Sequence, residues 1–249
     1  MIYFLSDAHL GSKALDKGFG RQKQLCIMLR KMGKNASAIY LLGDIFDFWF
    51  EYFIHDHSKK QYSEFMHTIR HLTHKGVRVH FFTGNHDLWT FGGLAKMTGM
   101  VVHHHPYSIT VNDKSIYMAH GDEFMPDKRF QRLRRIFHNK RLQYCFRCLP
   151  PFLGNALGYG WAKRSRLKEL AHPLPYQGEE KEELVQYAKQ HEHKSHHDYY
   201  IFGHRHIDLD LQITANSRVV LLGDCFKLWT YAKVDDQGEL TLCSYNSQL

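Results

Sequence analysis

The chain has 249 residues, of which 43% are hydrophobic and 23% charged, and these values are ordinary for a globular protein. No stretch approaches the roughly 18 consecutive apolar residues of a membrane-spanning helix, and the first residues lack the basic and long apolar regions of a signal peptide. Five scattered cysteines, an odd number, fit a reducing compartment, so we expect a cytoplasmic protein.

The net charge of +8 is concentrated in one segment. From Lys128 to Lys168 there are 12 lysines and arginines and no aspartate or glutamate, whereas the rest of the chain has 21 basic and 25 acidic residues. A charge asymmetry of this kind indicates a surface that meets an anionic partner.

In chain order, the first half of the sequence alternates strand and helix patterns. Runs rich in β-branched and aromatic residues predict strands at 2–6, 38–42, 77–83, 107–111, 115–119, 199–202, 209–214, 218–222, 229–234 and 240–245. Apolar residues at helical spacing predict helices between the early strands, at 21–32, 58–74 and 92–97. The pattern predicts an α/β fold with two sheets, one mixed and one more antiparallel, flanked by helices.

Between residues 123 and 197 the strand pattern stops. Aromatic and leucine side chains recur at helical spacing among the arginines until Pro150 and Pro151 end the stretch, and an acidic, solvated helix is expected at 179–190. We interpret 123–197 as a helical lid inserted into a core that residues 1–122 and 198–249 form.

Five short motifs carry the chemistry, and most of them directly follow a strand-like run. They are Ser6-Asp7-Ala8-His9, Gly43-Asp44-Ile45-Phe46-Asp47, Gly84-Asn85-His86-Asp87, Ala119-His120-Gly121-Asp122 and Gly203-His204-Arg205-His206. Ligands at the carboxyl ends of strands lie where an α/β sheet binds its ligands. A cluster of aspartate, histidine and asparagine without thiolates suits divalent cations in sites of five or six ligands.

The order of these motifs resembles the calcineurin-like metallophosphoesterase superfamily across nearly the whole chain. The resemblance implies a two-sheet sandwich that holds two divalent cations, with Asp44 as the ligand that bridges them. It assigns Asp7, His9 and His206 to the first cation and Asn85, His120 and His204 to the second. Asp47 and Asp122 are then expected to orient histidines.

Plainer interpretations exist for the individual residues. A lone aspartate at a strand end is usually a turn or helix-capping residue. The histidines at 103–105 and within 190–198 are more typical of solvated surface than of metal sites. The pair Cys145 and Cys148 has no second pair with which to form a zinc site. It is the joint occurrence of seven ligands in one order that favours the metal interpretation.

Two neighbouring divalent cations acidify water and polarise a phosphorus centre, so the reaction class is metal-assisted hydrolysis of a phosphoester or phosphoanhydride. His86, which we expect to be paired with Asp87, would then lie near the phosphoryl oxygens. There it would stabilise developing charge or protonate a leaving oxygen, so both residues are predicted to be catalytic.

Residues of the predicted lid resemble one family within this superfamily. Asp127, the run from Phe130 to Arg134, Phe137-His138 and Ser165 are similar to the lid of the UDP-2,3-diacylglucosamine diphosphatases of lipid A biosynthesis. This likeness implies cleavage of the pyrophosphate of a UDP-linked, doubly acylated sugar, usually with Mn²⁺. It implies a substrate-binding set of Asn85, His86, Asp127, Ser165, Lys168 and His204.

Two positions depart from that family. The familiar diphosphatases have arginine where this chain has His86, and an asparagine and a lysine where it has Glu169 and His172. We expect Lys163, Arg164 or Lys168 to supply the missing positive charge. The departures leave the fold and the reaction class untouched and concern the identity of the substrate.

The basic, aromatic lid has several interpretations, of which the plainest is a solvated charged helix without a partner. The favoured one is an anionic membrane surface, with Phe130, Leu133, Phe137, Phe146, Phe152 and Trp161 lining a site for acyl chains. This would place the protein peripherally on the inner membrane. A nuclease of the same superfamily is the alternative, although no second DNA-binding domain is present, so nucleic acid is not the expected partner. A metal-free scaffold is less compatible with a complete ligand set, and the oligomeric state is not indicated.

Overall fold

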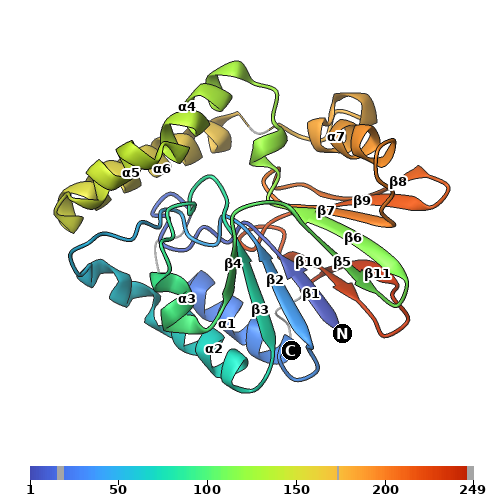
Figure 1. The fold of residues 1–249 in the computed structure, drawn as a ribbon, viewed down its shortest axis with the longest axis horizontal. Helices are drawn as coiled ribbons and strands as arrows, with labels where there is room; N and C mark the ends of the chain where they lie inside the picture. Colours follow the sequence, from blue (N-terminus) through green and yellow to red (C-terminus); the bar gives the residue numbers. More distant parts are fainter. Residues whose placement is uncertain (16–19, 173, 246–249) are drawn as a thin grey trace.

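A computed structural model of the chain describes residues 1–15, 20–172 and 174–245, and its two β-sheets pack face to face (Figure 1). The first sheet contains β1 (Ile2–Leu5), β2 (Ala38–Leu42), β3 (Arg78–Phe82), β4 (Val101–His103), β10 (Thr230–Val234) and β11 (Leu240–Ser244). The second contains β5 (Tyr107–Val111), β6 (Lys114–Ala119), β7 (Tyr199–Phe202), β8 (Asp208–Thr214) and β9 (Ser217–Leu222).

Both sheets are mixed. The order in the first sheet is β11-β10-β1-β2-β3-β4, in which β1 to β4 pair in parallel and β10 pairs antiparallel with both β1 and β11. The order in the second is β5-β6-β7-β9-β8, with β6, β7 and β9 parallel. The prediction of an α/β fold with two sheets is therefore confirmed, and the second sheet has as many parallel as antiparallel pairings.

Alternation of side chains along the strands divides the core into layers. Phe4 points between the two sheets, where it packs with residues such as Met118 and Val220. Its neighbour Leu5 points to the outer face of the first sheet. That face is covered by α1 (Gly20–Met32), α2 (Ser63–His74) and α3 (Gly93–Thr98), and a short 3₁₀ helix, η1 (His57–Tyr62), leads into α2.

The helix α7 (Glu183–Glu192) covers the outer face of the second sheet. Its residues Leu184, Val185 and Ala188 are fully buried against strand residues of β6 and β7. A helix is present here as predicted, but it is not solvated, because Glu179, Glu180 and Glu182 precede α7 and leave it with a buried apolar face. Two further 3₁₀ helices occur: η2 (Asp122–Phe124) directly follows β6, and η3 (Glu179–Lys181) directly precedes α7.

Three helices form a separate layer over the carboxyl ends of the strands of the first sheet (Figure 1). They are α4 (Lys128–His138), α5 (Lys140–Arg147) and α6 (Pro151–Ala171). Aromatic side chains of all three, Phe137, Phe146 and Trp161, pack against Phe50 and Trp89 in the loops beneath them. These aromatics therefore hold the helices onto the core.

The helix α6 and strand β4 were not predicted. Pro150 and Pro151 do follow the end of α5, but Pro151 is also the first residue of α6, where a proline needs no hydrogen-bond partner. Strand β4 has only three residues and two of its side chains are half-buried, so it has no apolar run to reveal it.

Two glycines set how closely α6 approaches the core. A Cβ atom at Gly154 would lie 2.3 Å from the Tyr52 hydroxyl, and one at Gly158 would lie 2.2 Å from the Phe48 ring. Phe48 is only 4% exposed and packs against Trp89, so it has little room to move. Any larger residue at these two positions has to push the helix outward.

Replacing Gly158 by alanine should destabilise the protein by about 1–3 kcal/mol, since overpacking outweighs the gain of about 1 kcal/mol in helix propensity. The matched control is Gly160→Ala on the same helix, where a new Cβ atom meets nothing within 4 Å. That variant should be as stable as the parent or more so. Urea unfolding of both variants makes the comparison, and equal free energies of unfolding would contradict the close approach described here.

Candidate metal centre

The five motifs meet at one end of the sandwich, in loops that leave the carboxyl ends of parallel strands. Loops after β1, β2 and β3 supply residues from the first sheet, and loops after β6 and β7 supply residues from the second. The first group is Asp7, His9, Asp44, Asn85 and His86, and the second is His120, His204 and His206. All of these side chains are buried or half-buried.

The backbone at this end is strained. Five of the seven predicted ligands have a positive φ, between 44° and 68°, which residues other than glycine rarely adopt. They are Asp7, His9, Asp44, His204 and His206. Such strain persists only where the surroundings hold it in place, and it concentrates at functional sites.

Hydrogen bonds between the loops provide that support. The Asp7 amide donates to the carbonyl of Gly43 at 3.0 Å, and the His9 amide donates to that of Asp44 at 2.9 Å. The two sheets are joined in the same way, because the His204 amide donates to Asp7 Oδ2 at 2.9 Å. The motif residues thus form one connected unit.

The first group of candidate ligand atoms surrounds a point between the two sheets. His206 Nε2 lies 3.1 Å from Asp7 Oδ1 and 3.2 Å from His9 Nε2. His9 Nε2 is 3.8 Å from both Asp7 Oδ1 and Asp44 Oδ2. The ligand atoms of Asp7, His9 and His206 all lie within 4.8 Å of one another.

The second group contains Asp44, which also lies close to His9 of the first group. His120 Nε2 is 3.6 Å from Asp44 Oδ2 and 3.3 Å from Asn85 Oδ1. The ligand atoms of Asp44, His120 and His204 also lie within 4.8 Å of one another. Asp44 Oδ2 therefore lies between the two groups, 3.8 Å from His9 Nε2 and 3.6 Å from His120 Nε2, where the resemblance expects a bridging ligand.

The outer nitrogens of the imidazole rings are held in a consistent way. Nδ1 of His120 donates to the carbonyl of Leu42 at 2.8 Å, and Nδ1 of His9 lies 3.5 Å from the Asp47 carboxylate. In each case Nε2 faces the ligand group. This arrangement fixes the tautomer and the direction of a metal-binding imidazole.

These donor sets fit divalent cations. Bond lengths of about 2.1 Å place neighbouring ligands of one cation about 3–3.4 Å apart, close to the separations of the nitrogen and oxygen atoms here. Buried carboxylates also need compensating positive charge, and Asp7 and Asp44 are both buried at the point where the groups meet.

The pKa values of the site's side chains also reflect the need of the buried carboxylates for positive charge. Burial opposes charge on Asp44, but His120 and His86 outweigh it and hold the pKa of Asp44 below its usual value. Burial likewise disfavours a charged His206, yet Asp7 and Glu169 raise its pKa to about 9. Burial and the neighbouring His120 lower the pKa of His204 to about 4. The carboxylates therefore attract positive charge to particular imidazoles.

His86 lies at the centre but is not paired with Asp87, so that prediction was wrong. Its Nδ1 donates to the carbonyl of Asp47 at 2.8 Å, and its ring is close enough to Asp44 and His9 to form a third candidate ligand group. Trp161 of α6 covers it, with ring centroids 4.9 Å apart. Burial lowers the pKa of His86.

Asp87 binds backbone groups of the neighbouring loops. Its carboxylate accepts backbone N–H groups from Gly84 at 2.8 Å and from Asp44 and Phe46 at 3.2 Å each. It thus fastens the loop after β3 to the loop after β2. Asp87 positions the ligands and does not touch His86.

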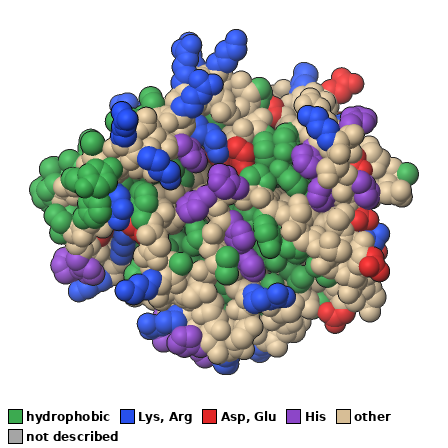
Figure 2. All heavy atoms as spheres, viewed as in Figure 1, with side chains coloured by type: hydrophobic (Ala, Val, Ile, Leu, Met, Phe, Trp, Pro, Cys, Tyr) green, Lys and Arg blue, Asp and Glu red, His purple; other side chains and the backbone are tan. Residues whose placement is uncertain are grey.

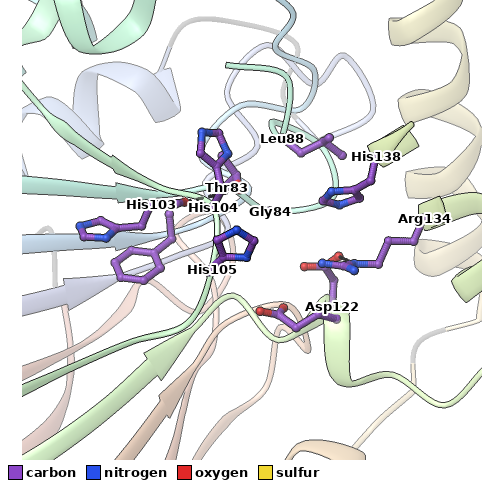
Figure 3. A pocket seen from close by; sticks show the side chains of 11 residues that line it. Thr83, Gly84, Leu88, His103, His104, His105, Asp122, Arg134 and His138 are labelled. Atoms are coloured by element: carbon purple, nitrogen blue, oxygen red, sulfur yellow. Dashed lines mark hydrogen bonds and ion pairs between the residues drawn. The ribbon is translucent and has the colours of Figure 1, made fainter. Parts of the chain in front are cut away.

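Asp122 also departs from the prediction that it orients a histidine. It accepts a hydrogen bond from Arg134 of α4 at 2.8 Å. Both residues line a pocket between α4 and the strand ends, which also includes His104, His105 and His138 (Figure 3). His104 and His105 are exposed, as expected, whereas His103 is half-buried in β4 beside His80.

The predicted lid residues are placed further from the ligand groups. Asp127 is exposed and caps α4 by accepting from the Phe130 amide at 2.6 Å. On α6, Ser165 is half-buried and Lys168 is exposed. Lys163 and Arg164, which were expected together with Lys168 to supply the positive charge of the family's lysine, are exposed as well.

Sequence reasoning missed two residues of α6 that reach the centre. Arg166 is 2% exposed and its Nη2 lies 2.6–2.7 Å from both ring nitrogens of His9. Glu169 forms ion pairs with both Arg166 and His206. The spacing of Gly154, Gly158, Ala162 and Arg166 by four residues is the signal that was available, since it marks one face of a helix.

Comparison with models of known protein families finds no match. Individual relatives do match. A UDP-2,3-diacylglucosamine hydrolase from Porphyromonas gingivalis is 35% identical over 250 aligned residues, which cover 94% of each chain. Relatives of the same name from Edwardsiella ictaluri and Haemophilus influenzae are 32% and 31% identical, over 69% and 59% of this chain and 64% and 60% of their own.

Solved structures are more distant. A dimetal phosphatase from Danio rerio aligns with a TM-score of 0.46 at 12% identity, covering 98% of both chains. These values are low, and the assignment therefore rests on the sequence relatives. Because the Porphyromonas relative is similar over almost the full length of both chains, this protein belongs to the UDP-2,3-diacylglucosamine hydrolase family.

Proposed function

We propose that the protein is a two-metal hydrolase that cleaves the pyrophosphate of UDP-2,3-diacylglucosamine, releasing UMP and 2,3-diacylglucosamine 1-phosphate. The observation that carries the proposal is the convergence of buried aspartates and histidines from five separate motifs into two neighbouring ligand groups, with Asp44 of the second only 3.8 Å from His9 of the first. The choice of substrate is supported by the name of the Porphyromonas relative and by the alignment, which covers 94% of both chains.

Seven residues are proposed to hold the two cations, for which we propose Mn²⁺. Asp7, His9 and His206 hold the first, Asn85, His120 and His204 hold the second, and Asp44 is shared. When bound, the cations supply Lewis acidity and lower the pKa of water. The surrounding loops keep this charge in a buried site, where electrostatic stabilisation of a transition state is strongest.

The protein's own groups orient the phosphate and exclude water. His86 is proposed to contact the phosphoryl oxygens, because Asp47 holds its Nδ1 and its Nε2 is left to face the centre. Asn85 and His204 flank the same place. Trp161 closes the site from the lid side and keeps bulk water away from His86. Asp127, Ser165 and Lys168 are proposed to contact the sugar and its substituents.

The lid, proposed as residues 123–197, offers an apolar and cationic surface for a lipid substrate. Within the described residues, exposed apolar side chains gather on α4, α5 and α6, and Figure 2 shows hydrophobic side chains clustered beside lysines and arginines at that end of the molecule. They include Ile136, Leu142, Tyr144, Phe152, Leu153, Leu157, Leu167 and Leu170. None of the described helices is both long and apolar enough to cross a bilayer.

We therefore propose peripheral attachment to the cytoplasmic side of the inner membrane. Each lysine or arginine near an anionic surface contributes about 1 kcal/mol to attachment. Apolar residues such as Phe152, which is 71% exposed, would enter the lipid interface. The pyrophosphate of the substrate would then reach the metal centre while its acyl chains stay in the membrane environment.

The deciding experiment measures kcat/KM for UDP-sugars with no, short and long acyl chains at fixed salt. We expect a steep rise with chain length, since each buried methylene contributes about 0.8 kcal/mol. Charge alone predicts salt-sensitive binding without dependence on chain length. A flat series would contradict the lipid substrate, and hydrolysis of oligonucleotides in preference to UDP-sugars would favour a nuclease.

A further inference from the structure

Three of the buried imidazoles have outer nitrogens that are held by the core itself. Asp47 lies against His9 and accepts from His86 through its carbonyl, and the carbonyl of Leu42 accepts from His120. These partners belong to β2 or to the loop that follows it. They are therefore in place whenever the first sheet is folded.

His206 is different, because the partner of its outer nitrogen comes from α6. Nδ1 of His206 is paired with one oxygen of the Glu169 carboxylate, while its Nε2 faces Asp7 at 3.1 Å. The other oxygen of Glu169 is bound by Arg166 Nη1. Although the Glu169 side chain is 43% exposed, both of its oxygens are thus engaged.

Arg166 fixes this carboxylate from the same helix. Nη2 of Arg166 is almost equidistant from the two ring nitrogens of His9. The guanidinium therefore lies against the imidazole ring as a whole and is not directed at the lone pair of one nitrogen. His9 Nε2 therefore remains directed at Asp7, Asp44 and His206. Arg166 and Glu169, one helical turn apart, together clamp both histidines of the first ligand group.

The packing of α6 determines whether this clamp is in place. Gly154 and Gly158 allow the helix to approach the loop of Phe48 and Tyr52 so closely that a Cβ atom would collide. Arg166 lies on the same buried face, two and three turns further on. If α6 moves outward, Glu169 leaves His206 without a partner for Nδ1.

We infer that Glu169 is a positioning residue that makes binding of the first cation and closure of α6 favour each other. This rests on the proposed function only in that His206 holds a cation. A carboxylate behind a metal-binding histidine typically contributes 10- to 100-fold to metal affinity. Since coupling between two equilibria is reciprocal, a bound cation must stabilise the closed helix by the same factor.

The charge of the Glu169 side chain matters as well as its position. An uncharged amide cannot balance the charge of Arg166 or accept from His206 as strongly as a carboxylate does. The carboxylate is therefore what ties α6 to the histidine here.

The test is calorimetric titration of chelator-treated protein with MnCl₂, without substrate, on the parent, Glu169→Ala and Glu169→Gln. We expect the parent to bind two cations, and Glu169→Ala to bind one of them about 10- to 100-fold more weakly while the other is unchanged. Glu169→Gln, which keeps an acceptor oxygen, should fall between them. Glu180→Ala, an exposed carboxylate of the same segment, is the matched control and should behave as the parent.

Hydrogen exchange of residues 151–171 gives the second readout. Mn²⁺ should slow exchange of α6 in the parent and in Glu180→Ala, and should have no such effect in Glu169→Ala. Two unchanged affinities in Glu169→Ala, or metal-dependent protection of α6 that survives the substitution, would overturn the inference. A parent protein that binds no divalent cation would instead contradict the proposed function, and a parent that binds two cations but ignores UDP-diacylglucosamine would contradict only the substrate.

Discussion

Asp44→Asn should lower kcat/KM by at least about 10³-fold, which corresponds to about 4 kcal/mol of transition-state stabilisation. Asp44 belongs to the second ligand group and lies 3.8 Å from His9 of the first, and a neutral amide cannot balance two neighbouring cations. The substitution leaves the local structure intact, because the amide oxygen can still accept from the His86 amide, as Asp44 Oδ1 does at 2.8 Å.

The measurement combines hydrolysis at saturating Mn²⁺ with the metal content of the protein by mass spectrometry. Thermal unfolding shows whether the variant is folded, and Asp208→Asn, at an exposed position on β8, serves as the control. Activity within about tenfold of the parent would mean that Asp44 does not bridge two cations. The two-metal proposal would then fail.

Asp87→Ala should destabilise the protein by about 2–4 kcal/mol and abolish activity with it. The fully buried carboxylate accepts three backbone N–H groups, from Gly84, Asp44 and Phe46, and alanine leaves all three without a partner in the interior. The loops that carry Asp44 and Asn85 would separate, so the loss of stability and the loss of the ligand groups share one cause.

Urea unfolding and a Mn²⁺ titration test this result together. Asp87→Asn keeps one acceptor oxygen and should give an intermediate loss of stability. Asp208→Ala should be neutral, since surface substitutions usually change stability by less than about 0.5 kcal/mol. If Asp87→Ala were as stable as the parent yet inactive, Asp87 would act in the chemistry directly, as the sequence first suggested.

The sequence was informative wherever a ligand directly follows a strand. Asp7, Asp44 and Asn85 end apolar runs that only a sheet explains, and parallel strands bring such ends to one edge. The motifs and their order were thus sufficient to predict which side chains meet. They could not reveal that His86 and Asp87 face different partners, because adjacent residues in a tight loop point in different directions.

The contribution of α6 could not be predicted from residue types alone. Lys163, Arg164, Arg166 and Lys168 are all basic, and only the packing of Gly154 and Gly158 on the core decides that Arg166 is the buried one. The same applies to Glu169, which follows a basic run and has the composition of a solvated helix end. The roles of Arg166 and Glu169 depend on tertiary contacts. The contact between Arg166 and His9, for example, joins residues more than 150 positions apart in the sequence.

Because the ligand groups draw on both sheets, the centre is complete only when both sheets are formed and packed together. The first sheet brings Asp7 and Asp44 and the second brings His206, almost 200 residues later in the chain, so a chain with one sheet formed has only part of each group. A cation that binds only the finished arrangement stabilises it in proportion to the logarithm of its concentration over its dissociation constant. A cation held by residues of both sheets would therefore also hold the two halves of the sandwich together, so the free energy of unfolding would rise with the concentration of that cation.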